Sequence, residues 1–313
     1  MAQAFGLCIN PSRLEARATL KRIGLTLGDP AGIGPEIVRA ALASGQLPKT
    51  AKYAVIGDPV KCSLGQPTAE TARAALEALE EGVIRARHGE IDGIVTGPIH
   101  KARMYEIGFK FPGQTEFFAD RCGVKNFAML LTGGNLTVAL VTTHVPLREV
   151  AAALSKDEIV RVGLLLENFL RRRRIQRPRI AVAGFNPHAG ESGALGREEI
   201  EIIAPAIEKL RENCAAHSIF AGPFSPDTIF HHAADGDWDA VLCMYHDQGL
   251  IPLKLHAFHQ GVNVTLGLPF PRTSPDHGTA FAIAGQEIAR PDSMIAAIKL
   301  AVELAPASPA KRA

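Results

Sequence analysis

Short apolar runs that read as strands, each followed by a polar turn, constrain the fold of this chain most strongly. Segments of helical periodicity lie between several of these runs, for example residues 68–88 and 155–174. Two of the runs, 128–131 and 136–144, are joined by a Gly-Gly-Asn turn and predict a β-hairpin. Alternating strands and helices are typical of an α/β protein, in which functional side chains gather where strands end.

Three of these runs end at, or shortly before, a histidine: His144, His188 and His246. If the three strands lie side by side, the three imidazoles could meet. Three neutral nitrogen ligands suit a divalent transition metal and leave coordination positions open for a substrate. Each histidine alone could also be a solvated side chain at a strand end, so the metal site is a hypothesis about all three together.

The run that ends at residue 243 leads into a stretch with His246, Asp247 and, after a proline, Lys254. Asp247 could act as a second metal ligand or accept a proton, and Lys254 could bind an anion. The same residues are compatible with a capped strand end that has no catalytic role.

Two further stretches have the layout of anion sites. Residues 28–34 form a glycine-rich turn between a strand and a helix, although their spacing does not match the Gly-x-Gly-x-x-Gly dinucleotide fingerprint. Thr115 is expected to cap a helix N-terminus, where backbone N–H groups can bind phosphate. A structural turn explains residues 28–34 equally well, and for Thr115 on its own helix capping is the default interpretation.

Composition excludes several functional classes. The 313 residues are enough for two domains or one large one, and a formal net charge of +2 gives no field that would favour nucleic acid or a membrane surface. Five cysteines without a Cys-x-x-Cys pair argue for a reducing compartment. Residues 1–20 lack the apolar core of a signal peptide, and no apolar run is long enough to span a bilayer. We therefore expect a cytoplasmic protein.

Six motifs together resemble one enzyme family. Residues 28–36 and 276–280 are similar to the two hallmark loops of the isocitrate and isopropylmalate dehydrogenase fold. Four further stretches narrow the resemblance to the 4-hydroxythreonine-4-phosphate dehydrogenases, NAD-dependent enzymes of vitamin B6 synthesis: 96–101, 113–117, 186–191 and 245–249. There are two departures from the family pattern. The segment 58–91 is short, and Gln114 stands where the family usually has histidine.

The resemblance implies a fold and a reaction. The fold would be an α/β architecture of the isocitrate/isopropylmalate dehydrogenase type, with two α/β/α domains and a cleft between them. Residues 20–114 with 263–310 would form the first domain and carry the NAD loop. Residues 115–262 would form the second and carry the metal and the dimer interface. The family oxidises the C3 hydroxyl of 4-phosphooxy-L-threonine with NAD, and NADP is the alternative cofactor. Loss of carbon dioxide then gives 3-amino-2-oxopropyl phosphate for pyridoxal 5'-phosphate synthesis.

The resemblance also implies site residues and partners. The active site would lie at the interface of a homodimer, take residues from both subunits, and bind a phosphorylated hydroxy-amino acid. One divalent metal (zinc, magnesium or cobalt) would sit on His144, His188 and His246. The substrate-binding residues would be Gln114, Thr115, Lys254, Asn263 and Arg272. Asp247 and Lys254 are the candidates for catalytic roles. The NAD-binding residues would be Asp276, His277, Gly278, Thr279 and Ala280.

Three rival functions remain open at this point. A paralogous dehydrogenase of four-carbon sugar acid phosphates, such as threonate or erythronate 4-phosphate, would share the metal and phosphate sites and differ around the amino group. A metal-dependent hydrolase could use the three histidines but would leave the loop 276–280 unexplained. A non-catalytic protein that binds a phosphorylated metabolite would not need the three histidines together.

Overall fold

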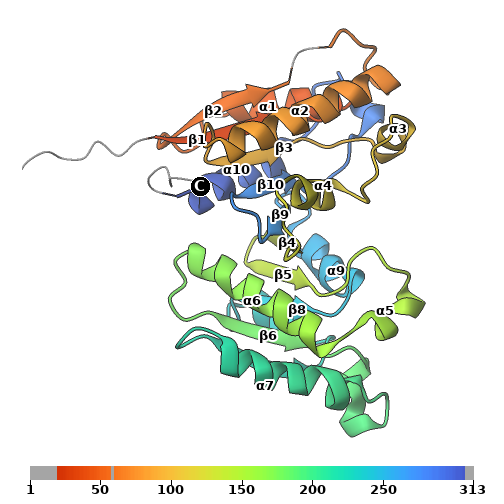
Figure 1. Ribbon diagram of the computed structural model, residues 1–313, viewed down its shortest axis with the longest axis vertical. Coiled ribbons are helices and arrows are strands. Elements are labelled where there is room, and N and C mark those ends of the chain that lie inside the picture. Colours follow the sequence, from red (N-terminus) through yellow and green to blue (C-terminus); the bar gives the residue numbers. More distant parts are fainter. Residues whose placement is uncertain (1–19, 58–59, 307–313) are drawn as a thin grey trace, which may run out of the picture.

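The computed structural model describes residues 20–57 and 60–306 as a ten-stranded sheet covered by helices (Figure 1). Three predictions fall partly outside these residues: the absence of a signal peptide in 1–19, the start of the short segment at Asp58, and the end of the first domain at 307–310. The strands are β1 (Lys21–Thr26), β2 (Ala51–Ile56), β3 (Gly93–Thr96), β4 (Ala128–Gly133), β5 (Leu136–Leu140), β6 (Arg179–Ala183), β7 (Ile219–Phe224), β8 (Ala240–Cys243), β9 (Val262–Leu266) and β10 (Arg272–Pro275). The α-helices are α1 (Gly34–Ala43), α2 (Ala69–Arg87), α3 (Lys101–Glu106), α4 (Gln114–Arg121), α5 (Leu147–Ala153), α6 (Lys156–Arg172), α7 (Ala204–Asn213), α8 (Ile229–Ala234), α9 (His246–Ala257) and α10 (Asp292–Leu304). Three irregular helical turns complete the set: η1 (Pro187–Gly193), η2 (Glu199–Ile203) and η3 (Phe281–Ile283).

The strand order of the single mixed sheet is β2-β1-β3-β10-β9-β4-β5-β8-β6-β7. β4 and β5 form the hairpin that the sequence predicts, and β9 is antiparallel to both of its neighbours. Strands β5, β8 and β6 lie side by side and run parallel. Their carboxyl ends, which precede the three predicted metal ligands, therefore lie along one edge of the sheet.

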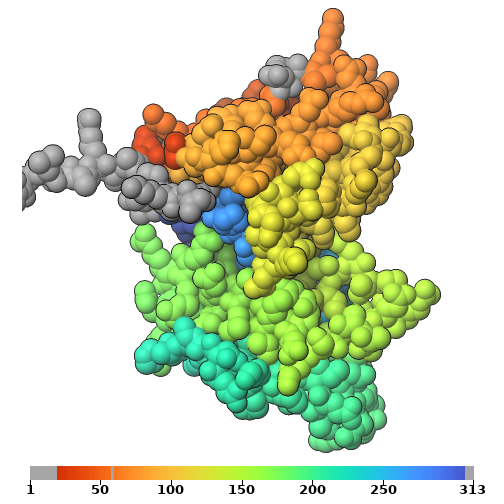
Figure 2. Space-filling model, in the orientation of Figure 1, coloured from red at the N-terminus to blue at the C-terminus, as the bar shows by residue number. Residues whose placement is uncertain are grey.

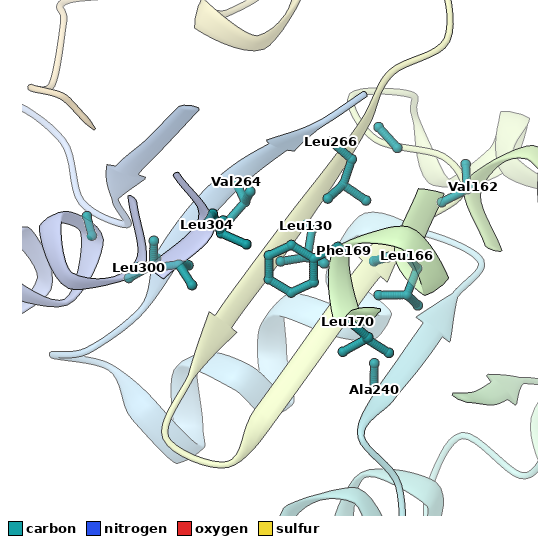
Figure 3. Packing of buried hydrophobic residues seen from close by; sticks show 14 of the residues in the cluster. Leu130, Val162, Leu166, Phe169, Leu170, Ala240, Val264, Leu266, Leu300 and Leu304 are labelled. Carbon is teal, nitrogen blue, oxygen red and sulfur yellow. The ribbon is translucent and has the colours of Figure 1, made fainter. Parts of the chain in front are cut away.

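One face of the sheet is covered by a hydrophobic core that extends through both ends of the molecule. Helices α1, α10, α6 and α7 all contribute buried side chains to it. Figure 3 shows Phe169 of α6 near Leu130 of β4, between Val264 of β9 and Leu170. Leu300 of α10 belongs to the same core. Since these helices share one apolar layer across the middle strands, that layer ties the two ends of the sheet together.

The opposite face carries two separate cores. Helices α2, α3 and α4 pack around Phe117 and Phe118 at one end of the sheet, and α8 and α9 pack around Leu250 and Leu253 at the other. The middle strands lie between these two groups of helices. Figure 2 shows that the molecule is hollowed on the side where α3 and α5 lie. The predicted division into residues 20–114 with 263–310 and residues 115–262 stays a prediction. It would assign α4 to the second domain, although α4 packs with α2 and α3.

Two predicted helix starts have different outcomes. Ser155 caps α6 as its sequence suggests, because its side chain accepts a hydrogen bond from the Glu158 backbone N–H. The prediction that Thr115 is an N-cap is wrong. Gly113 occupies that position, and Thr115 lies inside the first turn of α4. Its hydroxyl is instead hydrogen-bonded to the hydroxyl of Thr265, 3.2 Å away, so it joins α4 to β9.

Among residues 20–57 and 60–306, none of the helices is both long enough and apolar enough to cross a membrane. The 19-residue helix α2 shows why length alone does not suffice. It carries several glutamate and arginine side chains, and only one of its faces is buried.

Candidate active site

A cavity of about 340 Å³ lies between the two helical groups on the hollowed face. Its walls come from the end of β3, the start of α4, strands β4, β9 and β10, helix α9 and the loop after β10. Of the predicted site residues, those that line it are Gln114, Thr115, His144, Lys254, Asn263, Arg272, Asp276, His277 and Gly278. Residues that are distant in the sequence are thus brought to one place by the crossing of β9 and β10 through the middle of the sheet.

Arg272 forms the polar floor of this cavity. It is only 2% exposed, and its guanidinium lies 5.6 Å from the centre of the Phe118 ring. One terminal nitrogen, Nη2, donates to Thr96 Oγ1 at 2.6 Å and to Gln114 Oε1 at 2.9 Å. The other, Nη1, donates to Thr265 Oγ1 at 3.3 Å. Burial lowers the pKa of Arg272 to about 9, and nearby Glu116 opposes this shift. The group therefore remains cationic at neutral pH and can attract an anion into the cavity.

Gln114 is tied to its surroundings at both ends of its amide. While Oε1 accepts from Arg272, Nε2 donates to the Gly97 carbonyl at 3.1 Å. The amide therefore orients Arg272 within the wall of the cavity. A histidine at this position could accept from the arginine only when neutral, since protonation would place a second cation beside it.

Several polar atoms around the cavity have no hydrogen-bond partner among the described residues. They are Asn263 Oδ1, Glu116 Oε2, Arg272 Nε and His277 Nε2, and all four are buried. Buried polar groups are normally paired, because leaving one unpaired costs roughly 1–3 kcal/mol. Four such atoms around one cavity indicate a site that a polar ligand completes.

The loop of the predicted NAD-binding residues 276–280 closes one end of the cavity. Asp276 forms an ion pair with Lys254 Nζ at 3.1 Å, which links the loop to α9. Thr279 accepts a hydrogen bond from the Ile33 backbone N–H at 2.9 Å, so the glycine-rich turn 28–34 supports this loop. A side chain on Gly32 would lie 2.8 Å from the same carbonyl. Glycine is needed there because the two loops approach so closely.

The open parts of this loop fit a nucleotide. A Cβ added to Gly278 would meet no atom within 4 Å, so the backbone there faces free space. Ala280 has a left-handed backbone with φ of 44° and turns the chain into η3. His277 lines the cavity through a ring whose Nδ1 lies 3.1 Å from the Gly278 carbonyl. Free backbone and an unpaired ring nitrogen suit a ligand with many oxygen and nitrogen atoms.

His144 and His246 meet at the other end of the cavity. Their ring centres lie 5.8 Å apart, and both rings line an adjoining hollow with Tyr245 and Asp247. Burial lowers the pKa of His144, the charge of Lys101 lowers it further, and Glu116 opposes both. His144 is therefore neutral near pH 7, the form in which histidine binds a metal.

Asp247 orients one of these rings. Its carboxylate lies 2.7 Å from His246 Nδ1, which leaves His246 Nε2 as the free ring nitrogen. A carboxylate on the far nitrogen is a common companion of a metal-bound histidine because it holds the ring in place. The two histidines and Asp247 thus fit part of a divalent metal site.

His188 does not join the other two histidines within this chain. The three strands are neighbours, as predicted, but η1 carries His188 away, and its ring contacts Glu191 at 3.1 Å. Among the described residues no group of three or more His, Cys, Asp or Glu side chains is placed to hold a metal. One chain therefore supplies two of the three predicted ligands at one place.

The backbone of η1 explains this separation. Five consecutive residues, 188–192, have positive φ values between 45° and 80°. Four of the five are not glycine, and each such residue costs roughly 1–2 kcal/mol in this conformation. The turn persists because the buried carboxylate of Glu199, 3% exposed, accepts hydrogen bonds from the backbone N–H groups of Phe185 and Asn186, both at 2.7 Å. This clamp holds His188 outward, at the surface.

Comparisons with known proteins identify the family of this chain. The family model described as pyridoxal phosphate biosynthetic protein PdxA matches residues 11–301. The chain belongs to the PdxA family. A relative from Caulobacter vibrioides, named 4-hydroxythreonine-4-phosphate dehydrogenase, is 43% identical over 92% of this chain and 98% of its own. A second relative with that name, from Maricaulis maris, is 44% identical over 91% and 98%.

Solved structures share the fold. The crystal structure of 4-hydroxythreonine-4-phosphate dehydrogenase from Klebsiella pneumoniae is 37% identical and covers 91% of this chain and all of its own, with a TM-score of 0.77. A terephthalate 1,2-cis-dihydrodiol dehydrogenase from Burkholderia xenovorans is 28% identical over 91% and 98%, with a TM-score of 0.65. The dehydrogenase-type α/β fold expected from the motifs is therefore confirmed.

Two charged residues of the cavity wall, Glu116 and Lys101, were not among the predicted site residues. Glu116 directly follows the predicted pair at 114 and 115, and its place in the same helical turn was the available signal. Lys101 also lines the cavity, although an exposed helix start explains its sequence context equally well. Glu199 is a third omission, because nothing local to it indicates which backbone groups it would bind.

Proposed function

We propose that this protein oxidises the C3 hydroxyl of 4-phosphooxy-L-threonine with NAD and that the product then loses carbon dioxide to give 3-amino-2-oxopropyl phosphate. The observation that carries the proposal is one cavity with a buried cation, Arg272, in its wall, a histidine pair at one end and the open loop 276–280 at the other. These suit, respectively, an anionic group, a metal-bound hydroxyl and a dinucleotide. The names of the relatives support the same assignment.

The residues that line the cavity would have distinct roles in binding the substrate. Arg272 and Lys254 bind the anionic groups of the substrate, and the guanidinium can hold two oxygens at once. Asn263 offers its unpaired Oδ1 to a donor on the substrate. Gln114 and Thr115 keep Arg272 and β9 in place. Lys254, paired with Asp276, joins the substrate side of the cavity to the NAD loop.

A divalent metal would be held by His144 and His246 with His188 as third ligand, and Asp247 would orient His246. Zinc, magnesium or cobalt would each supply Lewis-acid polarisation of the C3 oxygen. In the reaction the C3 hydrogen leaves as hydride to NAD and the hydroxyl proton is released. The bond between C1 and C2 of the resulting β-keto acid then breaks, carbon dioxide leaves, and C2 takes up a proton.

A homodimer would complete the site. Helix α9, which carries His246 and Lys254, also exposes Ile251 (65%) and Leu255 (88%). Apolar side chains exposed on one helix mark a surface for protein contact. We infer that a second copy packs near this surface and that the partner subunit's His188 reaches the His144–His246 pair. The composition supports the further proposal that the enzyme works in the cytoplasm.

The main rival is a dehydrogenase of threonate or erythronate 4-phosphate, which differs at the amino group. The 28% identical cis-dihydrodiol dehydrogenase shows that this fold also serves other hydroxylated substrates. The proposed enzyme and this rival would both use NAD and a metal, so the substrate has to be tested directly.

The deciding experiment follows NADH absorbance at 340 nm, the usual wavelength for this cofactor, with purified protein and each substrate in turn. We expect turnover of 4-phosphooxy-L-threonine, loss of turnover with chelator, and recovery on adding a divalent metal. The same assay with NADP measures cofactor preference. Turnover of threonate 4-phosphate alone would favour the rival, and no NADH with any of these substrates would overturn the proposal.

A further inference from the structure

Two acidic side chains line the cavity, Glu116 and Asp276, and they differ in their surroundings. Asp276 is neutralised by Lys254 at 3.1 Å. Glu116 forms no ion pair within 4.0 Å among the described residues, and its Oε2 is buried without a hydrogen-bond partner. A carboxylate left unpaired inside a cavity costs free energy unless a ligand supplies the missing donor.

Lys101 also lines the cavity, and it forms no ion pair within 4.0 Å with any other described residue. The space between the two is open because Gly113 has no side chain. A Cβ added there would lie 3.2 Å from Glu116 Oε2 and 4.0 Å from Lys101 Nζ. Two opposite charges therefore border the same gap without forming an ion pair with each other, and a group that carries both charges could bind to both.

The cavity wall also holds positive charge besides Lys101. Arg272 and Lys254 line the same cavity and could bind an anion. A substrate with a phosphate at one end and an amino acid group at the other would match both sets of charges.

We propose that Glu116 binds the ammonium group of the substrate and Lys101 its carboxylate, so that this pair makes the site specific for an amino acid rather than a hydroxy acid. The inference rests on the proposed function and goes further by naming the residues that choose between its substrate and the main rival. A 2-hydroxy acid would leave the Glu116 carboxylate facing a neutral hydroxyl. An ammonium adds a full positive charge to this contact, and its Coulomb attraction to the carboxylate favours the amino acid over the hydroxy acid.

Calorimetric binding without NAD provides a test that does not depend on turnover. The Kd of 4-phosphooxy-L-threonine is compared with that of threonate 4-phosphate for the wild type, Glu116→Gln, Lys101→Met and the control Asp120→Asn. Asp120 is an exposed acid on the same helix, so its substitution makes the same charge change outside the cavity.

We expect Glu116→Gln to reduce the preference for the amino acid about 10- to 100-fold, the range for losing one hydrogen bond between charged groups. Lys101→Met should weaken both ligands by a similar factor and leave the preference unchanged, because both carry the carboxylate. Asp120→Asn should change neither value. Glu116→Asp, which keeps the charge, should restore part of the preference.

An equal loss for both ligands in Glu116→Gln would overturn the inference, because a structural role predicts that pattern. A wild type that binds neither ligand, or prefers the hydroxy acid, would overturn it as well. If the wild type binds the amino acid but forms no NADH, the proposed function fails, while the ratio of Kd values still decides the role of Glu116.

Discussion

Replacing Gln114 with alanine tests how the cavity holds its buried cation. The Gln114 carbonyl is one of two acceptors for Arg272 Nη2, at 2.9 Å, and Thr96 is the other, at 2.6 Å. The change removes the first acceptor and leaves the guanidinium with Thr96 and Thr265. Because Arg272 Nε has no hydrogen-bond partner among the described residues, the two threonine hydroxyls would then be the remaining acceptors for this guanidinium in that part of the chain.

The size of the effect follows from these contacts. Losing a hydrogen bond to a charged group costs about 1.5–3 kcal/mol, and the remaining Thr96 contact favours the lower end. A value near 1.5 kcal/mol corresponds to about a tenfold change in an equilibrium constant. We expect KM for the phosphorylated substrate to rise about tenfold while kcat changes less than about threefold, because the role proposed for Arg272 is to bind the substrate and not to join the chemistry.

Steady-state kinetics and thermal unfolding together measure this. Gln114→Glu is the matched comparison, because a carboxylate still accepts from Arg272. It should restore the unfolding temperature that Gln114→Ala lowers, yet raise KM further, since it neutralises the charge that attracts the substrate. The proposed role of Gln114 is wrong if Gln114→Ala changes KM by less than about twofold and leaves the unfolding temperature unchanged, while Arg272→Lys raises KM.

Three further outcomes are expected. His144→Ala and His188→Ala should each lose bound metal. If His188 acts across a dimer, an equal mixture of the two variants should recover metal in about a quarter of the sites. Metal analysis that shows no recovery would mean that one chain supplies all three ligands. Glu199→Ala should lower the free energy of unfolding by about 1–3 kcal/mol and also lower metal content. If the variant loses stability in a denaturant titration but keeps its metal, the Glu199 hydrogen bonds do not position a metal ligand. Because the pKa of Arg272 lies at about 9, its charge is present below that pH and is lost above it. KM for the substrate should therefore be flat from about pH 7 to 8 and rise roughly tenfold per unit above about pH 9, and a flat KM across that range would mean that another cation holds the substrate.

Local patterns in the chain were enough to predict the class of fold and to mark many of the residues around the cavity. Apolar period and turn composition are local properties, so the hairpin of β4 and β5 and the cap at Ser155 could be predicted from a few neighbouring residues. The motifs at 96–101, 113–117 and 276–280 marked stretches that line the cavity. These predictions required only the order of residues along the chain.

Which side chains contact one another could not be predicted from these local patterns. Strand order brings β5, β8 and β6 together, yet five left-handed residues and the buried Glu199 turn His188 away from His144 and His246. Thr115 bonds across to Thr265 instead of capping its own helix. Glu116 Oε2 is buried and has no hydrogen-bond partner in the described part of the chain, a fact that depends on elements distant in sequence. Such contacts depend on three-dimensional register and backbone direction, which no local pattern of residue types contains.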